Sequence, residues 1–267
     1  MVNNVALDKE AHRDLKVDTR PSEAYGDNIG MVGVVPREFA RLVGHYPIFL
    51  RRTPTGDAFE CGVVLGFGNT ENLFLTGDGW DALYVPLNIQ RQPFAVFSRP
   101  EDGNLVVTVD MDSPRLTRKG GQDLFLSDGA PSEYMKQVTG ALNEMVQGAR
   151  MGFEYTAKLE ALGLIEKVHV DLKFADASTI KLDGLYSISR QKLQALPAAD
   201  LAELRDLGYL EWIYIQLASL THMNALLVRK NRILAGQAGD ATDNARPAEA
   251  HRGIEDDSPA RAGRRKR

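Results

Sequence analysis

The sequence is poor in the residues that form short-range metal and disulfide sites. It has one cysteine among 267 residues, so Cys61 has no partner for an intramolecular disulfide and cannot form a cysteine zinc motif. Its five histidines include no pair at the i, i+4 or alternate-residue spacing of a local ligand set. A metal site would have to assemble from side chains distant in the sequence, and we predict no metal and no cofactor.

Long apolar runs are also missing. The most apolar region, residues 207–228, is interrupted by Glu211, Gln216, His222 and Asn224, and no other stretch approaches the roughly 20 consecutive apolar residues that cross a bilayer. The N-terminal residues lack the apolar segment of a signal peptide. We therefore expect a soluble, cytoplasmic protein that does not insert into membranes.

The charge balance gives no overall attraction for nucleic acid. The net charge is −4 and the pI is about 5.8, so neither nucleic acid nor an acidic membrane surface is an expected partner. With 43% hydrophobic and 25% charged residues, the composition is that of an ordinary globular protein with a sizeable core.

Recognisable catalytic motifs are absent from the sequence. No Gly-x-Ser-x-Gly elbow occurs, and Cys61 lies in an apolar, strand-like run where burial is expected. Gly66-Phe67-Gly68 lacks the third glycine and the following helix of a dinucleotide-binding loop, so a turn is the better interpretation. We assign no catalytic residues and favour a protein that is not an enzyme.

The region from Tyr46 to Asp110 has the pattern of a β core. Short apolar runs alternate there with turn residues such as Pro54, Gly56 and Asp102-Gly103, which is typical of antiparallel strands. The strands are predicted at residues 48–51, 59–65, 73–76, 83–85, 94–98 and 105–111.

Helical periodicity flanks this β region. Apolar residues recur three and four apart over residues 134–162, which predicts one long helix ending at Gly163, and residues 36–43 form a short helix. A final apolar helix is predicted over residues 210–227. The fold class is therefore α+β: an antiparallel β core, as a half-barrel or sheet, packed by a long central helix and a C-terminal apolar helix.

Residues 168–188 predict further strands. Val168 to Phe174 alternate apolar and polar residues, as a half-buried strand does. Residues 179–182 and 185–188 flank Asp183-Gly184, a favoured hairpin turn, so we expect these two strands to pair.

Three segments are expected along the chain. Residues 1–30 form an N-terminal arm, residues 31–232 form one α+β domain, and residues 233–267 form a disordered tail. That tail ends in the basic run Arg264-Arg265-Lys266-Arg267, which we interpret as a solvated end.

An aromatic and polar cluster is the candidate binding surface. Tryptophan and tyrosine near loop ends, with an arginine close by, can recognise a peptide, although Trp80 and Tyr84 could equally close the end of the sheet. His12 is added as either an anchor of the arm or a residue in a pocket. The candidate binding residues are Asn72, Trp80, Tyr84, Arg91, Phe94 and His12.

A series of short motifs, taken together in order and spacing, resembles the SapC family of bacterial proteins, named for a component linked to the surface layer. The resemblance covers about residues 5–230. The motifs are His12-Arg13-Asp14-Leu15, Val35-Pro36, Glu38-Phe39, Tyr46-Pro47-Ile48, Asn72-Leu73-Phe74, Trp80-x-x-x-Tyr84-Val85-Pro86, Arg91-x-Pro93-Phe94, Asp123-Leu124-Phe125, Gly184-Leu185-Tyr186-x-Ile188 and Leu217-x-Ser219-Leu220.

The resemblance implies an accessory role rather than a reaction. The family has no firmly assigned catalytic residues, and its genes often lie near those for TonB-dependent receptors, halogenase-like proteins and cupin oxygenases. One departure is Gln92, where the family often has another basic or aromatic-flanking residue, so Arg91 lacks a helper.

We therefore expect a non-catalytic accessory or binding protein that recognises a peptide or partner protein in a surface-protein, uptake or peptide-modification system. Two alternatives stay open. One is a metal-dependent peptide-modifying or oxygenase-like enzyme that uses His12 with carboxylates. The other is a structural subunit that forms a homodimer through its final helix.

Overall fold

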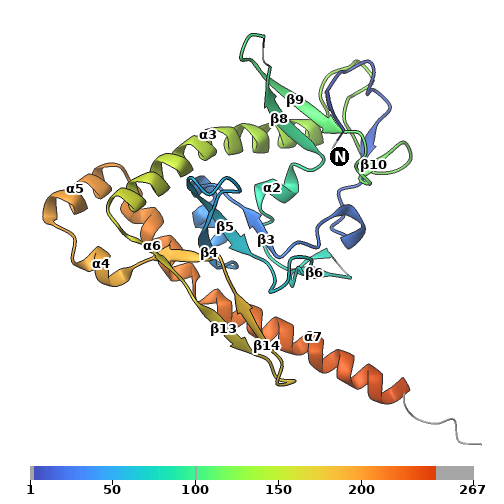
Figure 1. Cartoon of the computed structure of the whole chain (residues 1–267). Coiled ribbons are helices and arrows are strands. Elements are labelled where there is room, and N and C mark those ends of the chain that lie inside the picture. The colour runs from blue at the N-terminus through green and yellow to red at the C-terminus, as the bar shows by residue number, and fades with distance from the viewer. Residues whose placement is uncertain (1–2, 78, 100, 245–267) are drawn as a thin grey trace, which may run out of the picture.

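A computed structural model describes residues 3–77, 79–99 and 101–244 (Figure 1). Its largest sheet has five strands, and every paired strand in the sheet is antiparallel to its neighbour. In spatial order the strands are β12 (Ile165–Lys167), β15 (Tyr186–Ile188), β4 (Ile48–Arg52), β5 (Phe59–Val64) and β3 (Met31–Gly33).

Helices cover this sheet and bury a cluster that we call the first core. They are α1 (Phe39–Leu42), α4 (Arg190–Gln194), α5 (Ala198–Asp206), α6 (Tyr209–Ser219) and the second half of α3 (Glu133–Ala161). Aromatic rings contact one another in this cluster: Tyr155 lies edge-on to Phe39, Tyr209 and Trp212. Large rings bury much apolar surface each, so this cluster supplies the main hydrophobic stabilisation.

A three-stranded sheet forms a second cluster, the second core. Its order is β1 (Asn4–Ala6), β9 (Leu105–Asp110) and β8 (Phe94–Ser98). The N-terminal arm completes it, because β2 (Lys16–Val17) pairs with both β10 (Leu116–Thr117) and β11 (Gln122–Asp123). The buried side chains are Leu15, Val17, Phe94, Val109, Leu124, Met135, Val138 and Leu142.

Helix α3 connects the two cores. The hydroxyl of Ser132 caps its first turn by accepting from the amide of Met135 at 3.1 Å. The first half of the helix buries Val138 in the second core, and the second half buries Leu159 in the first. Gly148 lies between them, where a Cβ would come within 2.7 Å of the Val35 side chain, so the helix can approach the chain at Val35 this closely only with glycine there.

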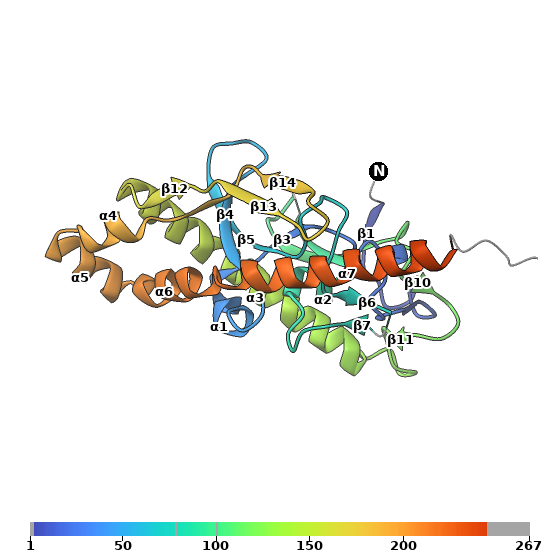
Figure 2. The ribbon, with the colours of Figure 1, turned by 90° about the horizontal axis from the view of Figure 1, so that it is seen from below.

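The remaining elements surround this frame. The hairpin of β13 (Val170–Lys173) and β14 (Thr179–Leu182) lies beside α7 (His222–Asn244), as both ribbon views show (Figures 1 and 2). Two short 3₁₀ turns, η1 (Glu23–Tyr25) and η2 (Pro36–Glu38), helix α2 (Leu87–Gln90), and the pair β6 (Leu75–Thr76) and β7 (Gly79–Trp80) complete the structure. Within the described ranges, no helix is long and apolar enough to cross a membrane.

The predicted α+β class, with antiparallel sheets, a long central helix and a C-terminal helix, is confirmed. Strand 94–98 is found at its predicted bounds, and the long helix is found within a residue of them. The final helix instead breaks after Ser219 and resumes at His222. Helix α7 then continues through Asn244, into the segment predicted to be a disordered tail, while the basic end of that tail lies outside the described residues.

Two local predictions are wrong. Residues 83–85 form a loop rather than a strand, because their backbone groups serve Tyr46 and Gln90 and pair with no strand. The strands on either side of Asp183-Gly184 do not pair with each other: β14 pairs with β13, and β15 pairs with β12 and β4. Burial against the five-stranded sheet has overridden the local turn preference.

Candidate functional site

Trp80 and Tyr84 are held by a buried tyrosine. The indole Nε1 of Trp80 donates to the Tyr46 hydroxyl at 2.7 Å, and that hydroxyl donates to the carbonyl of Tyr84 at 2.5 Å. The Trp80 ring stacks on Phe74 with 6.5 Å between centroids. Burial raises the pKa of Tyr46 well above its usual range, so its hydroxyl keeps the proton that it donates. These contacts fix both ends of the loop at residues 80–86.

A buried carboxylate holds the same loop from the other side. Glu38 accepts from the Tyr84 hydroxyl at 3.0 Å, from the Leu87 amide at 2.8 Å and from the Val35 amide at 3.0 Å. Burial is the largest influence on Glu38 and raises the pKa of its carboxyl group. The Arg41 guanidinium lies 4.7 Å from the centre of the Tyr84 ring. The loop is therefore preorganised by groups from the turn at residues 35–41.

Asn72 supports the arm. It is buried, its Nδ2 donates to the carbonyl of Asp27 at 2.8 Å, and its Oδ1 accepts from the amide of Phe74 at 3.0 Å. Because its side-chain amide both donates and accepts a hydrogen bond inside the protein, Asn72 links two chain segments.

Arg91 and Phe94 lie with the second core, apart from the contacts of Trp80. Phe94 is fully buried there. Arg91 donates from Nε to Asn88 Oδ1 at 2.7 Å and from Nη1 to the carbonyl of Phe94 at 2.5 Å. Desolvation lowers the pKa of Arg91, and within the described ranges no carboxylate oxygen lies within the 4.0 Å of an ion pair. The structure thus separates the predicted cluster into two groups.

His12 lies within the N-terminal arm. It is 9% exposed, and its Nδ1 accepts from the amide of Asp8 at 2.9 Å, which closes a turn of the arm. In the described part of the chain, no three His, Cys, Asp or Glu side chains gather as a metal site would require. The Cys61 thiol is buried, and burial raises its pKa to about 12, so it is a poor nucleophile.

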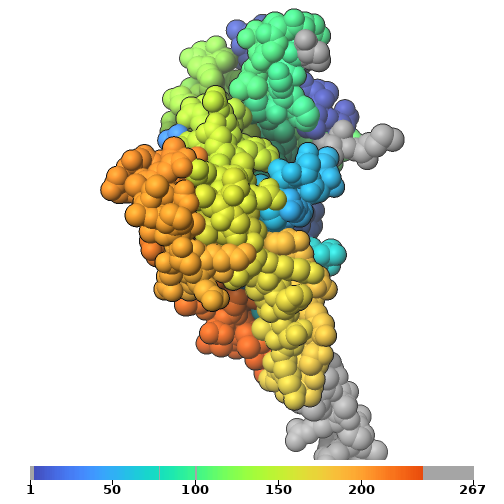
Figure 3. Space-filling view, turned by 60° about the vertical axis from the view of Figure 1, so that its left-hand side comes forward, coloured from blue at the N-terminus to red at the C-terminus, as the bar shows by residue number. Residues whose placement is uncertain are grey.

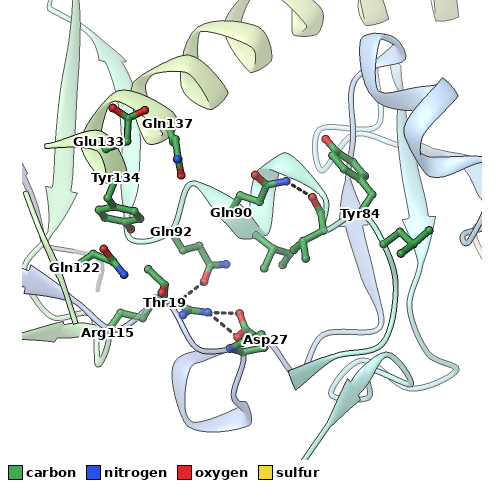
Figure 4. Close-up of a pocket in the computed structure, with 14 residues that line it drawn as sticks. Thr19, Asp27, Tyr84, Gln90, Gln92, Arg115, Gln122, Glu133, Tyr134 and Gln137 are labelled. Carbon is green, nitrogen blue, oxygen red and sulfur yellow. Dashed lines mark hydrogen bonds and ion pairs between the residues drawn. The ribbon is translucent and has the colours of Figure 1, made fainter. Parts of the chain in front are cut away.

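A cavity of about 660 Å³ lies between the two cores, and we call it the inter-core groove (Figure 4). One wall is the arm near Thr19 and Asp27. The opposite wall is the loop at residues 83–85 with α2, and the start of α3 closes the end through Tyr134 and Gln137. Its volume lies in the range of ligand pockets, which often form where two packed units meet.

A buried ion pair builds the arm side of the groove. Arg115 Nη2 donates to both carboxylate oxygens of Asp27, at 2.5 and 2.6 Å, and these side chains are only 5% and 0% exposed. Arg115 Nη1 donates to the carbonyls of Asp18 and Arg20, and Nε donates to Gln92 Oε1 at 3.4 Å. The guanidinium is therefore committed to holding the arm, so it is not a free cation for a ligand.

The groove surface combines amides with an apolar rim. Gln92, Gln122 and Gln137 present side-chain amides, and Gln90 donates to the carbonyl of Val85 (Figure 4). Leu83 stands at the rim with 95% of its surface exposed. Amides that both donate and accept beside an exposed aliphatic side chain suit the recognition of a polypeptide.

Tyr84 is the one predicted binding residue that lines this groove. The sequence reasoning missed the rest of the lining because the arm, residues 83–92, Arg115 and α3 are distant in sequence. Two local sequence features fall near this lining, namely the turn residues around Pro21 and the family-like motif that ends at Pro86, and neither indicates a groove.

The class defined by this fold is an α+β protein with a preorganised groove between two hydrophobic cores. Comparison with protein-family models places the chain more narrowly: it belongs to the SapC family, whose model matches residues 7–226. That match spans both cores and the groove. No curated protein and no solved structure matches the chain.

Proposed function

We propose that this SapC-family protein is a non-catalytic accessory protein that binds an extended segment of a peptide or partner protein in the inter-core groove. The observation that carries the proposal is the groove itself, about 660 Å³ in volume with Leu83 95% exposed at its rim. The family membership supports a partner from a surface-protein, uptake or peptide-modification system.

Preorganisation supports binding at this place. The loop that carries Leu83 is anchored by hydrogen bonds from Tyr46 and to Glu38, and the facing arm is held by Arg115. An isolated exposed leucine is common on protein surfaces and carries little information. A leucine on a fixed loop beside a groove is different, because binding then requires little further ordering of the chain.

The polarity of the lining indicates the kind of ligand. The Arg115 charge is neutralised by Asp27, and the remaining charged side chain, Glu133, lies 3.5 Å from Lys136. The groove therefore has no free cation from its own lining to attract a strongly anionic ligand. Glutamine amides can bond the N–H and C=O groups of an extended peptide, whose apolar side chains would meet Leu83, Val85 and Ile89.

The test compares variants that alter the groove with one that does not. Leu83→Ser removes the rim contact and Gln137→Trp fills the groove, whereas Leu207→Ser makes the first change at another exposed leucine, which is 47% exposed and lies on neither wall. In affinity purification from native cells, the partner should be recovered with wild type and Leu207→Ser, and reduced about tenfold or more by either groove variant.

Thermal unfolding provides the folding control, since all three changes are at exposed side chains and should leave the midpoint nearly unchanged. Equal recovery of the same partner by wild type and both groove variants would exclude the inter-core groove as its binding site.

A further inference from the structure

The β8–β9 hairpin projects from one end of the molecule and ends in an open strand edge. In the sheet order β1-β9-β8, β8 has a neighbour on one side only among the described residues. The tip of the hairpin projects beyond the helices in the ribbon view and forms the green end of the space-filling view (Figures 1 and 3). An apolar strand with a free edge is a template for another strand, so such edges are usually covered or paired.

The hydrogen-bond register shows which backbone groups face outward. Asp110 donates its amide to the carbonyl of Pro93, and Arg99 donates its amide to the carbonyl of Asn104, so residues 93 and 99 face β9. Because orientation alternates along a strand, residues 95 and 97 also face β9, and the N–H and C=O groups of Val96 and Ser98 point away from it. Within the described ranges, these four groups bond no other backbone group.

On the N-terminal side of Val96, the outward backbone groups of β8 are already hydrogen-bonded. The Phe94 amide donates to the carbonyl of Arg91, and the Phe94 carbonyl accepts from the Arg91 guanidinium. Beyond Ser98, residue 100 is a proline, which has no N–H to donate. The free part of the edge is therefore the short stretch from Val96 to Ser98.

We propose that two copies of this chain pair antiparallel along β8, with Phe97 on the twofold axis facing Phe97 of the second copy. In this register Val96 lies opposite Ser98 of the second copy, and Ser98 lies opposite its Val96. All four outward groups on each strand then find partners. Pairing stops at both ends because the Phe94 amide is already bonded to Arg91 and the chain turns back toward β9 after Arg99. The edge is self-complementary, as a twofold interface requires.

The side chains fit this register. Phe97 is 50% exposed, and a residue pair on the axis between two hydrogen-bonded pairs brings its side chains close, which favours an aromatic pair. Pairing thus covers an exposed aromatic side chain on each copy.

Sedimentation velocity of the full chain over a range of about 1 to 200 µM tests the proposal. Wild type should shift from monomer to dimer within that range. Phe97→Lys places two ammonium groups on the axis and should weaken the dimer about tenfold or more. Leu105→Lys is the matched control, because Leu105 is 59% exposed on the same hairpin but lies on β9, away from the open edge, and should dimerise like wild type.

A disulfide trap tests the register without relying on Phe97→Lys. Side chains across a non-hydrogen-bonded antiparallel pair are within disulfide reach, so Phe97→Cys should form a covalent dimer on mild oxidation, while Leu105→Cys should not. The buried Cys61 does not compete. A wild type that stays monomeric at every concentration, or equal cross-linking of both cysteine variants, would overturn the proposal.

Discussion

The first and second cores are stabilised in different ways. The first is a five-stranded sheet under several helices, filled with large aromatic and aliphatic side chains. The second is a three-stranded sheet that depends on the N-terminal arm, and the most deeply buried ion pair among the described residues, Arg115–Asp27, fastens that arm. A small sheet buries less apolar surface, so specific polar contacts have to hold its pieces together.

The two cores contribute different parts of the two proposed binding surfaces. The first core supplies the rigid support for the loop that carries Leu83, through Tyr46 and Glu38. The second core supplies the exposed features, namely the arm wall of the inter-core groove and the open edge of β8. Both proposed binding surfaces therefore lie where the smaller core ends, and the following predictions separate the two cores experimentally.

The largest effect is expected from Arg115→Met. Removing one partner of a buried ion pair leaves Asp27 charged and unpaired, which should lower the free energy of unfolding by about 3–5 kcal/mol. Chemical denaturation measures the loss. Hydrogen exchange should show it mainly in the arm and in β8–β9, and Asp27→Asn in the same chain should recover part of it. Equal loss of protection in β4 and β5 would contradict the separation of the cores.

A slightly smaller effect is expected from Leu50→Ala in the first core. Leu50 is fully buried in β4, and the cavity left by truncation should lower the free energy of unfolding by about 2–5 kcal/mol. Here hydrogen exchange should accelerate in β4, β5 and β15 before it does in β1 and β9. The opposite order would show that the first core does not behave as a separate unit.

Glu38→Gln tests the contact between the first core and the loop at residues 83–85, which forms one wall of the inter-core groove. The amide cannot accept all three hydrogen bonds, so the variant should be less stable by about 1–3 kcal/mol at neutral pH. The pKa of Glu38 is raised by burial above its ordinary value of 4.5. Such a carboxyl stabilises the folded state most below its unfolded pKa, and this contribution is lost as the pH rises through the folded pKa.

The stability advantage of wild type over Glu38→Gln should therefore shrink as the pH is raised from about 4.5. Denaturation of both proteins at a series of pH values measures the difference. An advantage that grows with pH over this range would mean that burial does not control this carboxyl group.

Tyr134→Phe should have the smallest effect. Its hydroxyl is buried without a hydrogen-bond partner in the described ranges, and burial raises the pKa of Tyr134 to about 12. Removing an unpaired hydroxyl while keeping the ring against Phe94 should leave stability unchanged or raise it by up to about 1 kcal/mol. A loss above that value would reveal a partner for the hydroxyl, such as a bound water.

Local sequence signals predicted much of the fold. The short apolar run at residues 94–98 and the helical spacing after Ser132 depend on near neighbours, and both elements are found. The loop at residues 83–85 was misassigned because its apolar side chains resemble a strand, whereas its conformation is fixed by Tyr46 and Glu38, some forty residues away in sequence.

The candidate site was less predictable for the same reason. Trp80 and Tyr84 were recognised as unusual, but only their contacts show that Trp80 is a support and that Tyr84 reaches the groove. The pairing of Arg115 with Asp27 joins residues 88 positions apart, and no spacing in the sequence indicates it. Grooves between packed units are products of tertiary structure and leave little periodic signal.

The most direct test of the central claim is site-specific photo-cross-linking of the full chain in its native cells. A benzophenone amino acid would replace Leu83 in one protein and Leu207 in a control, and mass spectrometry would identify the cross-linked peptides. The account predicts that position 83 labels one discrete segment of a partner, that Gln137→Trp abolishes this labelling, and that position 207 does not label it. Labelling of the same segment from both positions, or from position 83 regardless of Gln137→Trp, would contradict recognition in the inter-core groove.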